Sequence, residues 1–75
     1  MSKTSLINMI LASIGVGVGE REARVITGVL VNVLWELDLD TSFLLSVLSD
    51  IRIHCTNNND PDGLYITNAL IEEFK

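Results

Sequence analysis

Residues 20–37 constrain the fold of this chain most, because this run is apolar on more than one side. Its apolar residues recur every three or four positions, which predicts a helix, although many of them are β-branched and favour strands. At about 100° per residue the main apolar face is about 180° wide, and it holds Val25, Ile26, Val29, Leu30, Val33, Leu34 and Leu37. Val31 and Trp35 lie outside that face, so a second side of the helix also needs cover.

The chain is too short to cover such a helix by itself. It has 75 residues, of which 48% are hydrophobic, and a domain of this size buries only about 60% of the surface of its unfolded chain. We therefore expect one domain, residues 1–75, with an all-α fold: a small bundle of three to four helices that forms a homodimer. The expected dimer or partner interface consists of Val25, Val29, Val31, Leu34 and Trp35.

Turn-forming and capping residues divide the chain into four predicted helices, at about 4–14, 20–37, 42–55 and 64–74. The glycine-rich break at 15–19 does not fit a nucleotide-binding loop, because no strand precedes it and no Lys-Ser/Thr pair follows it. Asp40 or Thr41 suits the N-cap of the third helix. The acidic stretch of Glu36, Asp38 and Asp40 is either a solvated connection or a surface for a basic partner.

A loop is predicted at residues 56–63, which are all turn or cap formers, although Asp60 before Pro61 offers an earlier start for the last helix. The first ligand positions of an EF-hand calcium loop are matched here by Asn58, Asp60, Asp62 and Gly63. A calcium loop also needs a carboxylate at its last position, where this sequence has Ala69. We therefore expect a polar turn and no metal site.

The charge balance argues against nucleic acid as a partner. Ten acidic residues stand against five basic ones, a net charge of −5, whereas nucleic-acid-binding proteins carry a concentrated basic patch. One Cys and one His exclude an internal disulfide and a Cys/His zinc cluster. Residues 6–19 are uncharged, but the run is too short to span a membrane and lacks the flanks of a signal peptide. We expect a cytoplasmic protein without a membrane partner or a cofactor.

No pattern of side chains predicts catalysis. Ser42, at the start of a helix in an acidic chain, leaves an acyl-carrier-like protein as an alternative, although in that family the modified serine directly follows an aspartate and here Thr41 intervenes. His54 has no second ligand or nucleophile at a suitable spacing, and Cys55 falls on the apolar stripe of its helix. We expect no catalytic, cofactor-binding or metal-binding residue and no enzyme activity.

Three stretches carry a resemblance to a known family. The first runs from Leu11-Ala12-Ser13 through the glycines to Glu20-x-Glu22 and on to Val25, Val29, Asn32 and Leu34. The other two follow the polar loops: Phe43-Leu44-Leu45-Ser46-x-Leu48, and then Asn68-Ala69-Leu70-Ile71. In order and approximate spacing they resemble the YmgB/AriR family of enterobacterial biofilm and acid-resistance regulators, over roughly residues 11–74.

The resemblance implies a small helical homodimer that acts as a connector-type regulator in phosphorelay signalling, biofilm formation and acid response. DNA binding has been proposed for some members, but only Arg21, Arg24 and Arg52 are basic well inside this chain, which disfavours it here. We therefore expect a non-catalytic regulatory protein that binds itself and a regulatory or sensor protein. An inhibitor or antitoxin-type binding protein encoded by a mobile element stays open as an alternative.

Overall fold

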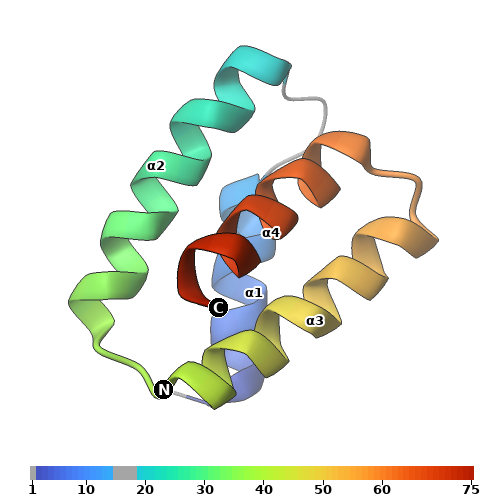
Figure 1. The fold of residues 1–75 in the computed structure, drawn as a ribbon. Helices are drawn as coiled ribbons and strands as arrows, with labels where there is room; N and C mark the ends of the chain where they lie inside the picture. The colour runs from blue at the N-terminus through green and yellow to red at the C-terminus, as the bar shows by residue number, and fades with distance from the viewer. Residues whose placement is uncertain (1, 15–18) are drawn as a thin grey trace.

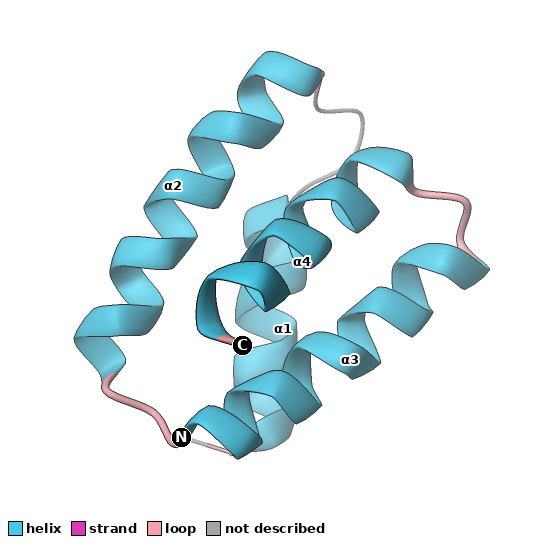
Figure 2. Cartoon of the chain, in the orientation of Figure 1, coloured by secondary structure: helices cyan, strands magenta, loops and turns pink. Residues whose placement is uncertain are grey.

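Four helices joined by short connections make up the fold in a computed structural model, which describes residues 2–14 and 19–75 (Figure 1). They are α1 (Lys3–Ile14), α2 (Glu20–Leu37), α3 (Thr41–Asn57) and α4 (Pro61–Phe74). The described residues contain no strand (Figure 2), so the all-α prediction is confirmed. The glycines at 15 and 17 of the predicted break lie outside the described residues. Within the described part of the chain, no helix is both long and apolar enough to cross a bilayer.

Two helix boundaries differ from the sequence-based prediction by more than one residue, and hydrogen bonds and helix capping explain them. α3 continues two residues past Cys55 because polar side chains there bond to their own helix: the Thr56 hydroxyl donates to the Arg52 carbonyl at 2.9 Å. The Asn58 amide then caps the end by donating to the His54 carbonyl at 2.8 Å. α4 begins at Pro61 and not at 64, because proline suits the first helical position and the preceding Asp60 is the N-cap.

Each helix packs mainly against two others, and α4 lies between α2 and α3. α3 and α4 form an antiparallel hairpin with the most extensive contacts in the fold, and α2 packs against the other side of α4 (Figure 1). α1 lies behind α4 in this view and packs mainly against α3, with fewer contacts to α2. The Lys3 ammonium fixes the start of α1 to α3, because it lies 3.0 Å from the Asp50 carboxylate and donates to Ser46 Oγ at 2.9 Å.

The core takes residues from every helix. α2, although it is the longest helix at 18 residues, contributes only three buried side chains, the same number as the 12-residue α1. The buried apolar residues are Leu6, Ile10, Ile14, Ala23, Leu30, Leu34, Leu44, Val47, Leu48, Ile51, Cys55, Ile66 and Leu70. One polar residue, Thr67, lies among them, and its hydroxyl is satisfied by the Gly63 carbonyl at 2.7 Å.

Candidate functional site

The side of α2 that bears Val25, Val29 and Val33 faces away from the core. These side chains are 63%, 55% and 37% exposed, whereas Ala23, Leu30 and Leu34 on the adjacent side are at most 3% exposed. We call the three exposed residues the valine stripe. An apolar row along one side of a helix is unusual on a surface unless another molecule covers it.

The broad apolar face predicted for α2 is therefore only half buried. α4 packs closely against the Leu30 and Leu34 side, while α1 contacts α2 much less and leaves the valine side open. Helical periodicity places all these residues on one face, but the position of the neighbouring helices decides which edge of that face is covered.

The five residues expected in an interface have different environments. Val25 and Val29 are exposed as a surface contact requires. Leu34 is 1% exposed and belongs to the core of the single chain, so we correct its assignment: packing inside the chain already covers it. Val31 is partly buried against the same core, and Trp35 is 60% exposed.

A shallow apolar groove runs beside the valine stripe, between α1 and α2. It has a volume of about 260 Å³ and is lined by Met9 and Ser13 of α1 together with Val25, Ile26, Val29, Leu30 and Val33 of α2. The Ser13 hydroxyl is already bonded, because it donates to the Met9 carbonyl at 2.9 Å. We call this the α1–α2 groove. Its lining suits apolar side chains of another helix.

A second exposed apolar group lies on a different side of α2. Trp35 packs against Phe74 at the end of α4, with ring centroids 5.0 Å apart and an interplanar angle of 44°. On an ideal helix Trp35 is about 120° away from Val29. The aromatic pair and the valine stripe are therefore two separate surfaces, and both can be in contact with other molecules at the same time.

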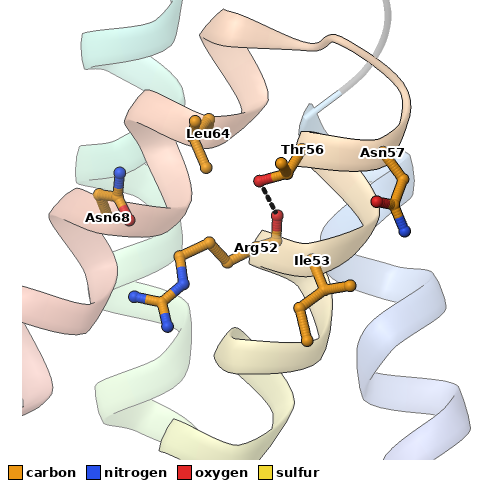
Figure 3. A pocket seen from close by; sticks show the side chains of 6 residues that line it. All are labelled: Arg52, Ile53, Thr56, Asn57, Leu64 and Asn68. Atoms are coloured by element: carbon orange, nitrogen blue, oxygen red, sulfur yellow. Dashed lines mark hydrogen bonds between the residues drawn. The ribbon is translucent and has the colours of Figure 1, made fainter.

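The α3–α4 groove, shown in Figure 3, is a third surface feature, and sequence reasoning did not identify it. Its volume is about 370 Å³, and it is lined by Arg52, Ile53, Thr56, Asn57, Leu64 and Asn68. Within the described residues Arg52 makes no ion pair, and the Thr56 hydroxyl is used inside α3. Because it forms between two helices, neither helix's own residue pattern reveals it.

Cys55 and Asp60, two residues with reactive or metal-binding side chains, make structural contacts. Burial raises the pKa of the Cys55 thiol from its ordinary value of 9.0, and nearby Asp60 raises it further, so the thiol is protonated at neutral pH. The Asp60 carboxylate accepts from the Gly63 amide at 3.0 Å as the cap of α4. In residues 2–14 and 19–75, no three His, Cys, Asp or Glu side chains are grouped to hold a metal ion.

Ser42, the candidate modified serine, is exposed in the first turn of α3. The cap of this helix is Asp40, whose carboxylate accepts from the Phe43 amide at 3.1 Å. His54 is exposed near the other end of the same helix. The described surface thus has apolar contact areas but no group of reactive side chains close together.

Comparison with protein-family models, with curated proteins and with solved structures finds no match for this chain.

Proposed function

We propose that this chain is a non-catalytic regulatory protein that works as a homodimer and binds a second, different protein. The observation that carries the proposal is the exposed valine stripe on α2. Valine side chains in a row on a stable helix gain free energy only when they leave water. A second copy of the chain is always present at the same concentration, and it offers the same apolar surface in return.

The free energy gained by burying the valine stripe indicates how large the dimer interface must be. Burying the exposed parts of the three valines is worth about 2 kcal/mol per chain at the usual value for a buried side chain. A micromolar dimer needs about 8 kcal/mol after the cost of association is subtracted. The valine stripe is therefore the centre of the interface, and the α1–α2 groove beside it supplies further area.

The aromatic pair, Trp35 and Phe74, is the surface we assign to the second protein. Tryptophan is enriched in protein interfaces, where it buries a large area at small entropic cost. The exposed carboxylate of Asp38 is close to Trp35 in sequence and favours a partner with basic residues. A role in stress, acid-resistance or biofilm signalling rests on the resemblance to the YmgB/AriR family alone.

Sedimentation equilibrium tests self-association directly. We expect a mass twice the 8.3 kDa of the chain, and we expect Val29→Asp to give a folded monomer because it places a charge in the centre of the interface. The matched control is Asn68→Asp, which adds the same charge at an exposed position on α4 and leaves the dimer intact. A wild-type protein that is folded and monomeric at high micromolar concentration contradicts the proposal.

Binding of a second protein is tested by affinity capture from the native host with the wild type and with Trp35→Ala. We expect a protein that the wild type retains and the variant loses. Val29→Asp in the same experiment shows whether this binding depends on the dimer. Equal retention by wild type and Trp35→Ala places the partner surface elsewhere.

A further inference from the structure

We infer that the second protein presents a helix that packs antiparallel to α2, along the side of α2 formed by Arg21, Gly28 and Trp35. The inference rests on the proposed function and deepens it, because it specifies what kind of partner engages Trp35. It follows from three observations: the alignment of these residues, a glycine that the chain itself does not require, and opposite charges at the two ends of α2.

The alignment concerns an exposed side of α2. Arg21, Gly28 and Trp35 are all exposed, and on an ideal helix they lie within about 40° of one another. We call this side the Gly28 face. Residues repeated every seven positions mark the seam along which two helices pack. The face is separate from the dimer surface, because Gly28 lies about 100° from Val29, whereas Ile26 of the α1–α2 groove lies about 60° from Val29 in the other direction.

Packing inside the chain does not account for Gly28. A Cβ at this position would meet nothing within 4 Å, and glycine destabilises a helix interior relative to alanine. The distance between two packed helices depends on the side chains at their contact. The absent side chain of Gly28 therefore lets a second helix approach α2 closely. About 10 Å further along, the same helix meets the exposed ring of Trp35, which Phe74 supports from α4.

The two ends of the Gly28 face carry opposite charges. Arg21 lies in the first turn of α2, and Asp38 follows the last turn, where its backbone N–H donates to the Trp35 carbonyl at 3.2 Å. Both side chains are exposed, and neither takes part in an ion pair within residues 2–14 and 19–75. The exposed carboxylates of Glu22 and Glu36 lie off this face, about 140° and 100° from Trp35.

Two further cations beside the Gly28 face are paired inside the chain. Arg24 lies 2.9 Å from the Glu20 carboxylate, and Lys75, which follows Phe74 at the end of α4, lies 3.1 Å from the Glu72 carboxylate. An approaching helix therefore meets an unpaired guanidinium near the start of α2 and an unpaired carboxylate after its end.

These charges define the partner helix. It needs an apolar middle against Gly28 and Trp35, an acidic side chain opposite Arg21 and a basic side chain opposite Asp38. From residue 21 to residue 35 α2 rises about 21 Å, so the partner needs about four helical turns. In the antiparallel direction its C-terminus lies near Arg21 and its N-terminus near Asp38, which are the placements that the dipole of the partner helix favours. Charge complementarity and the dipole thus select the same direction.

Two synthetic peptides test this surface on the intact protein. The probe is a helical peptide of about five turns without tryptophan, with an apolar side of alanine and leucine, lysines in its first turn and glutamates in its last. The control peptide exchanges the lysines and glutamates, which makes it the better helix by itself. Trp35 is the one tryptophan of the chain, so its fluorescence reports binding. We expect the probe to shift the emission and the control to bind about fivefold more weakly at low salt.

Substitutions on α2 locate the binding. Gly28→Ala should bind the probe about tenfold more weakly, although the chain itself becomes more stable, because the added Cβ holds the peptide away. Arg21→Glu should weaken the probe about fivefold and tighten the control peptide, and its new charge suits the first turn of a helix. Asn68→Ala, an exposed change on α4, is the matched control and should bind like the wild type. Val29→Asp should keep the affinity within about twofold, because the valine stripe is another side of α2.

The outcomes separate this inference from the proposed function. Unchanged Trp35 emission at about millimolar probe overturns the inference, and so do equal affinities of the two peptides or an unaltered affinity of Gly28→Ala. In the capture experiment, a host protein that both Trp35→Ala and Gly28→Ala lose supports the inference. A host protein that Trp35→Ala loses and Gly28→Ala retains overturns it, while the proposed function stands.

Discussion

Replacing Gly63 with alanine tests the close approach of α3 to the first turn of α4. Gly63 is the third residue of α4, and a Cβ there would lie 2.9 Å from the Cys55 sulfur and within contact distance of the Asp60 carboxylate that caps the helix. Alanine normally stabilises a helix relative to glycine. A destabilised variant would therefore show that the close contacts with Cys55 and Asp60, and not the backbone conformation, require glycine at this position.

The magnitude follows from three effects. Moving the Asp60 side chain aside costs its cap, about 1 kcal/mol. Pushing the Cys55 sulfur into a packed core costs about 2 kcal/mol. The higher helix propensity of alanine stabilises the variant by about 1 kcal/mol. We expect a net loss of about 2 kcal/mol, which lowers the Tm of a domain of this size by roughly 10 °C.

The assay is thermal and urea unfolding followed by circular dichroism, in a Val29→Asp background so that self-association does not contribute. Gly28→Ala is the matched control, because open space surrounds Gly28 and the same substitution should stabilise the chain by about 1 kcal/mol. In a Cys55→Ala background the cost of Gly63→Ala should shrink, since the sulfur is gone. A Gly63→Ala protein as stable as its parent would refute the reasoning.

The remaining predictions concern Trp35 and Cys55. Trp35→Ala should cost only about 1 kcal/mol of stability, because it removes an aromatic pair at a surface position; a larger loss in urea unfolding would mean that Trp35 belongs to the core. The raised pKa of Cys55 in the folded chain means that the unfolded state loses its proton first, so stability should decline as the pH rises through about 9. Unfolding free energies from pH 7 to 10 should show this slope in the wild type and a shallower one in Cys55→Ala, and equal slopes would contradict the assignment to Cys55.

Helical periodicity, together with turn-forming and capping residues, was sufficient to locate the four helices. Leu6 and Ile10 of α1 and Leu44 and Ile51 of α3 are buried, and each lies on the single apolar side of its helix. In α2 the apolar side is wider, and the single chain covers only part of it. The helical pattern of α2 therefore showed that it has more apolar residues than a single chain covers, but it did not show that Leu34 is among the covered ones.

The details that the sequence did not predict depend on contacts between residues distant along the chain. Gly63 was interpreted as part of a turn, yet it is helical and is small because Cys55 of another helix approaches it. The α3–α4 groove arises from the same hairpin. The pairing of Trp35 with Phe74 joins residues on α2 and α4. Such contacts cannot be predicted from the residues that neighbour each position in the sequence.

The packing of α1 mainly against α3 has a consequence during synthesis. The Lys3 contact to Ser46 joins residues 43 positions apart, so the first helix leaves the ribosome long before the helix that covers it. At about 5–20 residues per second this interval is on the order of several seconds. Throughout it, the apolar side of α1 is exposed to water or bound by a chaperone, and it becomes buried only after α3 has been synthesised.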